Sequence, residues 1–159
     1  MAIRVAVDAM GGDNAPGAIV RGAVQALSDE ADLELVFVGD EGRIHKELSA
    51  VGADANKSRI RIVHASQVVG MDELPVEAVK TKKDSSLIRM AELAAAREVD
   101  AILSAGNTGA CAAVCQLKIK PLPCVARPGI AVTIPAFHGP FVLCDVGANI
   151  QAKPRHLYE

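Results

Sequence analysis

Short apolar runs that alternate with amphipathic helical stretches limit this chain to few folds. Apolar runs rich in β-branched residues cover residues 3–9, 33–39, 59–65 and 100–106. The stretches between them repeat apolar residues at helical spacing, as residues 19–27 do. Strands that alternate with helices pair in parallel through crossovers. The pattern therefore predicts an α/β fold, a three-layer sandwich around a mostly parallel sheet.

The other predicted elements continue this alternation. Helices are expected over residues 41–52, 74–84, 85–99 and 107–119, and a further helix begins within residues 147–159. Two more strands, at 129–135 and 140–149, flank a turn signal at 136–140 and should be neighbours. No linker or low-complexity tract interrupts the chain, so one α/β domain over residues 1–159 is predicted. The last helix has no stop signal, which suggests a fold that is cut short.

Composition argues against several classes of function. The 159 residues are 50% hydrophobic with a formal net charge of -2, which fits an aliphatic core and argues against a nucleic-acid surface. A signal peptide and a membrane-spanning window are both missing from the sequence, so a cytoplasmic protein is expected. The four cysteines are expected to be free thiols. Cys111 and Cys115 could share a helix face, but no second closely spaced pair completes a metal site. No metal or other cofactor is predicted.

Three predicted strands end in loops that combine glycine with polar residues. The loops are "DAMGGD" at 8–13, "SAGNTGA" at 104–110 and "DVGAN" at 145–149. The carboxyl ends of parallel strands meet at one sheet edge, where glycines and helix N-termini form anion sites. The second loop ranks first for a phosphate or an oxyanion, since Ser104, Asn107 and Thr108 add donors. Glycines that serve only a tight turn and helix packing are the alternative.

The first loop is expected to shape the site rather than to hold the anion. Its carboxylates, Asp8 and Asp13, would repel a phosphate placed on them. Asp13 or Asn14 is therefore predicted to cap the next helix, and Asp8 to orient either a basic group or a neighbouring loop. The loop matches neither the dinucleotide fingerprint nor a P-loop with its lysine. A nicotinamide or ATP site thus lacks its best evidence.

A lysine cluster lies just before another predicted helix start. Lys82 and Lys83, with Ser85 and Ser86, could complete an anion pocket, and the helix cap is expected at Asp84, Ser85 or Ser86. A solvated surface is the alternative for these lysines. The four histidines are isolated in the sequence and are interpreted as surface or turn residues. No G-x-S-x-G elbow supports covalent catalysis by a serine.

Four motifs together resemble one family. They are "VAVDAMGGDNAP", "KKDSSL", "LSAGNTGA" and "DVGAN", and in this order and at these separations they resemble the PlsX family of bacterial phosphate acyltransferases of phospholipid synthesis. The resemblance spans nearly the whole chain, although members of the family are longer. A familiar variant of the first motif has His at the position of Asn14, so no proton transfer is assigned there.

The resemblance implies an enzyme that moves a long-chain acyl group from acyl carrier protein to inorganic phosphate, giving acyl phosphate and free carrier. It also implies a fold akin to phosphate acetyltransferase and to isocitrate and isopropylmalate dehydrogenases, a homodimer, and peripheral association with the membrane. Acyl transfer from coenzyme A and a non-catalytic anion-binding module are the alternatives. A metal-dependent dehydrogenase is weaker, because the sequence shows no matching set of carboxylates.

The hypothesis assigns roles to residues of all four motifs. The proposed catalytic residues are Ser104, Asn107, Thr108, Lys82 and Lys83. The proposed phosphate-binding or pocket-shaping residues are Gly106, Gly109, Ser85, Ser86, Asp8, Gly11, Gly12, Asp13, Asp145, Gly147 and Asn149. Further site residues are expected in the part that the longer members add.

Overall fold

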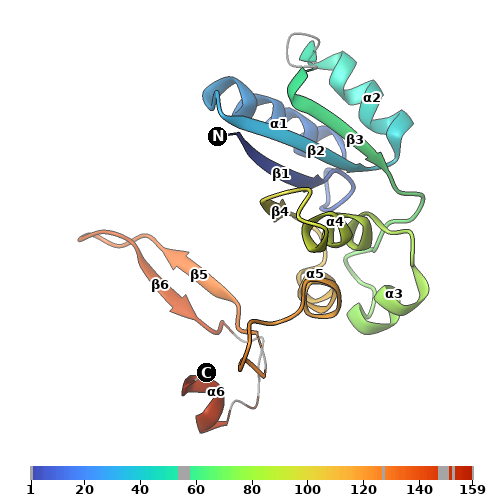
Figure 1. The fold of residues 1–159 in the computed structure, drawn as a ribbon. Coiled ribbons are helices and arrows are strands. Elements are labelled where there is room, and N and C mark those ends of the chain that lie inside the picture. The colour runs from blue at the N-terminus through green and yellow to red at the C-terminus, as the bar shows by residue number, and fades with distance from the viewer. Residues whose placement is uncertain (1, 54–57, 127, 147–150, 152, 159) are drawn as a thin grey trace. The chain divides into compact units, whose positions relative to one another are not determined.

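A computed structural model of the protein describes residues 2–53, 58–126, 128–146, 151 and 153–158 (Figure 1). The chain divides into two compact units, Met1–Ile119 and Lys120–Glu159, and each unit is described by itself. The organisation of residues 1–159 as one domain stays a prediction.

The first unit is built on a parallel sheet. Its strands are β1 (Ile3–Asp8), β2 (Leu33–Gly39), β3 (Ile60–His64) and β4 (Ala101–Leu103), in the order β3-β2-β1-β4. Each neighbouring pair is parallel, and the register places Val7 opposite Phe37 on one side and Leu103 on the other. Arg4 joins the amino ends of β1 and β4, because its Nε and Nη2 each donate to the Asp100 carboxylate at 3.0 Å. The predicted parallel sheet is confirmed.

Helices pack on both faces of this sheet. Successive strand residues point to opposite faces, so Phe37 and its neighbour Val38 enter different cores. On one face, α1 (Gly17–Asp29) and α2 (Glu41–Ala50) bury Val20 and Ile44 beside Phe37. On the other, α4 (Ser86–Ala95) buries Leu87 beside Val38, and α5 (Thr108–Val114) extends the same cluster. The predicted three-layer α/β sandwich is confirmed.

Most helix ends follow local sequence signals. Asp40 caps α2, since its carboxylate accepts from the Arg43 N–H at 2.8 Å, and Gly52 follows that helix with a φ of +65°. The short helix α3 (Pro75–Thr81) begins with proline in its first turn. The helix predicted over 107–119 changes hydrogen-bonding pattern, because α5 is followed by a π-helical turn, η2 (Cys115–Ile119).

The second unit contains a β-hairpin. Strands β5 (Ala131–Ile134) and β6 (Phe141–Cys144) pair antiparallel, and α6 (Pro154–Tyr158) follows. The two strands are neighbours, as predicted. They form a two-stranded sheet of their own, so β6 pairs with β5 and not with a strand of the parallel sheet. The connection between β5 and β6 is short, which permits only antiparallel pairing. The expected place of the loop at 145–149 beside the other two glycine loops stays a prediction.

Candidate functional site

Two glycine loops lie side by side at the carboxyl edge of the parallel sheet. They follow β1 and β4, which are direct neighbours. The Ser104 hydroxyl donates to Asp8 Oδ2 at 2.7 Å, and the Gly106 N–H donates to Ser104 Oγ at 3.1 Å. Asp8 is only 2% exposed, and its other oxygen accepts from the Met10 N–H at 3.1 Å. The predicted orienting role of Asp8 thus has a structural counterpart in a hydrogen-bond chain through Ser104 to Gly106.

Glycine is required where these loops touch. A Cβ on Gly11 would lie 2.9 Å from both the Gly106 nitrogen and Ser104 Oγ, closer than atoms pack. Gly12 has a φ of +108°, which side chains rarely adopt, and a Cβ there would lie 3.2 Å from the Ala105 oxygen. The glycines of the first loop therefore permit contact between two backbones.

Asn107 holds the start of α5 and a distant segment at once. Its Oδ1 accepts from the Ala110 N–H at 3.0 Å and so caps α5. Its Nδ2 lies 3.2, 3.3 and 3.0 Å from the carbonyl oxygens of Gly70, Met71 and Glu73. Because an amide has two N–H donors, these three acceptors share them. The residue is 7% exposed, and its side-chain donors and acceptor all bond to protein atoms.

Residues 66–84 form a segment that leaves the sheet after β3 and is closed at its base by Asp84. The Asp84 Oδ2 accepts from the Ser66 hydroxyl at 2.6 Å and from the Ser66 N–H at 3.0 Å. Arg89 Nε donates to the other oxygen at 2.7 Å. The Ser66 hydroxyl bond, the Ser66 N–H bond and then Arg89 hold the pKa of Asp84 well below its usual value of 3.8. The 66–84 segment is thus pinned where it begins and ends.

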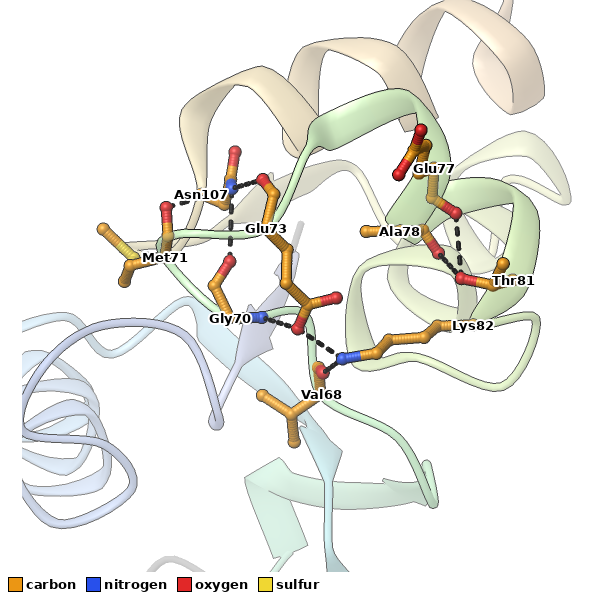
Figure 2. Close-up of polar contacts among 9 residues, drawn as sticks. All are labelled: Val68, Gly70, Met71, Glu73, Glu77, Ala78, Thr81, Lys82 and Asn107. Carbon is orange, nitrogen blue, oxygen red and sulfur yellow. Dashed lines mark hydrogen bonds and ion pairs between the residues drawn. The ribbon is translucent and has the colours of Figure 1, made fainter.

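The predicted anion ligands Lys82 and Lys83 both bond to protein atoms near α3. Lys82 Nζ pairs with Glu73 Oε1 and donates to the Val68 oxygen at 2.7 Å (Figure 2). This ion pair, followed by the Gly70 N–H, lowers the pKa of Glu73. Lys83 Nζ donates to the Val79 oxygen at 3.4 Å, near the C-terminus of α3, where cations are stabilised. Their contact with phosphate stays a prediction.

Ser85 and Ser86 start α4 in the interior. Ser85 occupies the N-cap position, as expected, but its side chain makes no capping bond. Ser85 and Ser86 are 0% and 1% exposed. Within the described part of the chain, Ser85 Oγ has no hydrogen-bond partner. Their role as phosphate ligands stays a prediction.

The remaining predicted site positions are Asp13, Asp145, Gly147 and Asn149. Asp13 is exposed, and the N-cap of α1 is Pro16 without a side-chain bond, so the predicted cap by Asp13 or Asn14 is wrong. The proline occupies that place because helix starts tolerate its missing N–H. Asp145, in the second unit, accepts from the Ile130 N–H at 3.4 Å. Gly147 and Asn149 lie outside the described residues.

Two thiols follow the second loop on successive helical turns, Cys111 in α5 and Cys115 at the start of η2. A hydrogen bond between Cys111 and Cys115 raises the pKa of Cys111, which is also desolvated and near Asp8. The same bond lowers the pKa of Cys115 to about 7. Cys111 and Cys115 therefore share a helix face, as the sequence suggested, and both are free thiols.

The solvent-facing part of the site is small and polar. Ala105, Thr108 and Gly109 are exposed at the second loop. Over the described ranges, no group of three or more His, Cys, Asp or Glu side chains gathers to hold a metal. Across that same part of the chain, every helix is too short or too polar to cross a lipid bilayer. The arrangement offers backbone and hydroxyl donors to an anion.

Glu73 and Ser66 are site-supporting residues that the sequence analysis missed. Glu73 pairs with a lysine nine positions later, and Ser66 meets an aspartate eighteen positions later. Neither separation is the three or four positions at which side chains on one helix are neighbours. No local signal could have found them, since both contacts depend on the path of the whole 66–84 segment.

Comparisons with known proteins place the chain in a family. Residues 3–159 match the sequence model of the family described as fatty acid synthesis protein. The chain is 44% identical over 157 residues to a protein of Magnetococcus marinus named phosphate acyltransferase, covering 99% of this chain and 44% of that protein. Proteins of the same name from Geobacillus thermodenitrificans and Bacillus licheniformis are each 42% identical over 158 residues, covering 99% of this chain and 46% of each relative.

Two facts follow from these matches. The chain spans less than half the length of the curated relatives it matches. The family match covers nearly the whole chain and confirms the resemblance drawn from its motifs. The chain belongs to the fatty acid synthesis protein family, which is the PlsX family.

Proposed function

We propose that this protein acts in phosphate acyl transfer, in which an acyl group moves from a thioester to inorganic phosphate. The observation that supports the proposal is the family match over residues 3–159, with relatives named phosphate acyltransferase. The proposed donor is a long-chain acyl group on acyl carrier protein. The proposed products are acyl phosphate and the free carrier thiol.

The reaction requires an anion site beside a thioester carbonyl. A phosphate oxygen attacks the carbonyl carbon and forms a C–O bond, while negative charge develops on the carbonyl oxygen. The C–S bond then breaks, and the thiolate leaves with the electron pair and takes up a proton from solvent. Donors that are fixed before the reaction stabilise the developing charge and hold the phosphate in attacking position. The step needs neither an oxidant nor a reductant.

The proposal assigns the ligand contacts to the exposed side of the second loop. Thr108 and Gly109 face solvent where α5 begins, so the Thr108 hydroxyl and the first amides of α5 are the proposed donors. Ser104 and Gly106 act through their bonds with Asp8. Asn107 acts by holding α5 in place, because its polar atoms already bond to protein.

A thiol-release assay tests the proposal. The natural polypeptide is purified in full, its intact mass is compared with 16.6 kDa, and release of carrier thiol from a long-chain acyl carrier protein is followed with and without phosphate. We expect release that depends on phosphate and produces acyl phosphate. Release without added phosphate contradicts the proposal. Faster reaction with acyl coenzyme A indicates the coenzyme A-dependent alternative, and phosphate binding without turnover indicates a binding module.

Thr108→Val tests the assigned contact. Loss of a hydrogen bond to a charged group costs about 1.5 to 3 kcal/mol, so we expect KM for phosphate to rise about tenfold or more. Thr133→Val, at an exposed position of β5, is the matched control and should leave KM unchanged. An unchanged KM in Thr108→Val would remove Thr108 from the site.

The same resemblance extends the proposal to assembly and location. We propose a homodimer in the cytoplasm with peripheral association to the membrane. Light scattering of the purified polypeptide should give twice the mass of one chain. Cell fractionation should find the protein in the cytosol, with a membrane-bound share that high salt or alkaline carbonate removes.

A further inference from the structure

We infer that Glu73 and Lys82 are positioning residues for the second glycine loop, and that Lys82 acts through Glu73 and Asn107 without touching the anion. The inference rests on the proposed function, because the position of residues 104–109 matters for turnover only if they belong to the site. It changes the role that the sequence assigned to Lys82. It also assigns a role to Glu73, which no motif includes.

The ammonium group of Lys82 is bound within the 66–84 segment. This lysine is the C-cap of α3, and its Nζ pairs with Glu73 and donates to the Val68 oxygen at 2.7 Å. Two of its three N–H donors are thus directed into the 66–84 segment. Its side chain is 29% exposed, and that of Glu73 is 33% exposed, so the pair is partly shielded from water. Figure 2 shows Lys82 reaching toward Glu73 and Val68.

Glu73 closes a turn with Gly70. The Glu73 carboxylate accepts from the Gly70 N–H at 2.8 Å, and the Glu73 N–H donates back to the Gly70 oxygen at 3.4 Å. This turn directs the carbonyl oxygens of Gly70, Met71 and Glu73 toward one point. The Asn107 amide lies at that point (Figure 2). The ion pair therefore shapes the acceptor group that fixes Asn107.

The Asn107 side chain connects this turn to the second glycine loop. Its Oδ1 caps α5 through Ala110, so the amide cannot rotate without losing bonds at both ends. Next to it, a Cβ on Gly109 would lie 2.7 Å from Pro75 Cγ, which shows that α5 and α3 begin in tight contact. A shift of the 66–84 segment must therefore move the first turn of α5, where Thr108 and Gly109 face solvent.

A double-mutant cycle separates this role from direct anion binding. Glu73→Gln, Lys82→Met and the double variant are compared in the thiol-release assay, with Lys80→Met, an exposed lysine on the same helix, as the matched control. If both residues act through one contact, each single variant lowers kcat about tenfold with KM for phosphate changed less than about twofold. The double variant should then be no worse than about tenfold, and Lys80→Met should match the wild type.

A direct ligand would behave otherwise. If Lys82 bound phosphate, Lys82→Met would raise KM for phosphate while Glu73→Gln, which frees the lysine, would leave it unchanged or lower it. That pattern, or two effects that multiply, overturns the inference. Lys82→Arg keeps the cation and should recover most of the lost kcat. A melting temperature for each variant identifies any that fail to fold.

A second measurement judges the inference apart from the proposed function. Hydrogen exchange on the chain of 159 residues reports the amides of Gly106 and Ala110, which donate to Ser104 Oγ and to Asn107 Oδ1. We expect Glu73→Gln, Lys82→Met and the double variant to raise their exchange to the same extent, with Lys80→Met unchanged. If the wild type shows no phosphate-dependent turnover, the proposed function fails and this exchange pattern alone decides. Unchanged exchange in the variants overturns the inference.

Discussion

The second glycine loop is held on two sides by different chemistry. On the β1 side, the buried Asp8 carboxylate accepts from Ser104, and two glycine backbones touch so closely that no Cβ fits on Gly11. On the α3 side, the neutral Asn107 amide donates to carbonyl oxygens of the 66–84 segment. The first contact requires the absence of a side chain. The second requires one particular side chain in one orientation.

The two sides also differ in the elements that they join to the second loop. The β1 side joins two neighbouring strands of one sheet, whose spacing is set by the ladder between Val5–Val7 and Ala101–Leu103. The α3 side joins a helix start to a segment that reaches it across 34 to 37 positions of sequence. We therefore expect mutations on the first side to distort the loops. Mutations on the second side should release α5 from the 66–84 segment.

Asn107→Asp should have the largest effect on stability, because it replaces the amide donors on the α3 side with carboxylate oxygens, which only accept hydrogen bonds. A carboxylate there would face three carbonyl oxygens at a position that is 7% exposed. An unpaired charge at such a site costs about 3 to 5 kcal/mol of unfolding free energy. Urea unfolding followed by circular dichroism measures this loss.

Asn107→Ala is the control for that substitution. It removes the cap and the amide donors without adding a charge, so we expect a smaller loss of about 2 kcal/mol. Equal stability of the aspartate and alanine variants would show that the carbonyl oxygens do not face position 107 closely in solution.

Sequence patterns were sufficient to predict the parallel sheet, because each of its strands can be recognised from its own residues. The β-branched runs and the glycines that follow them predict parallel strands and a shared edge, and Asp8 and Ser104 meet there. The contacts of Asn107 and Lys82 with residues 68–73 could not be predicted in the same way. Both depend on the 66–84 segment, whose path is set by long-range contacts such as Asp84 with Ser66. A polar residue in a glycine loop has the same local pattern whether it binds a ligand or a distant carbonyl.

Gly11→Ala tests the first side and should have the next largest effect. Its new Cβ would lie 2.9 Å from both the Gly106 nitrogen and Ser104 Oγ, so the two loops must separate. Forcing a methyl group into packed structure costs about 1 to 3 kcal/mol, measured by urea unfolding.

Gly22→Ala is the matched control for that prediction. Gly22 lies within α1, and a Cβ there would meet nothing within 4 Å. Alanine in a helix interior is more favourable than glycine by about 0.5 to 1 kcal/mol, so this variant should be more stable than the wild type. A loss of stability in Gly22→Ala would show that an added methyl group destabilises this unit wherever it is placed.

The smallest effect on stability is expected at the base of the 66–84 segment, and it disappears in acid. The pKa of Asp84 is lowered in the folded state, first by the Ser66 hydroxyl, so its carboxylate stabilises the fold above its usual pKa of 3.8. This contribution is lost as the pH falls below that value toward the lower folded pKa.

Asp84→Asn should therefore be less stable than the wild type at pH 6, and the difference should shrink between about pH 4 and pH 2. Ser66→Ala removes the bond with the largest influence and should weaken the same pH dependence in urea unfolding. The stability difference between wild type and Asp84→Asn must therefore shrink in acid if the ionised carboxylate stabilises the fold. A difference that stays constant down to pH 2 would contradict the assigned contact between Asp84 and Ser66.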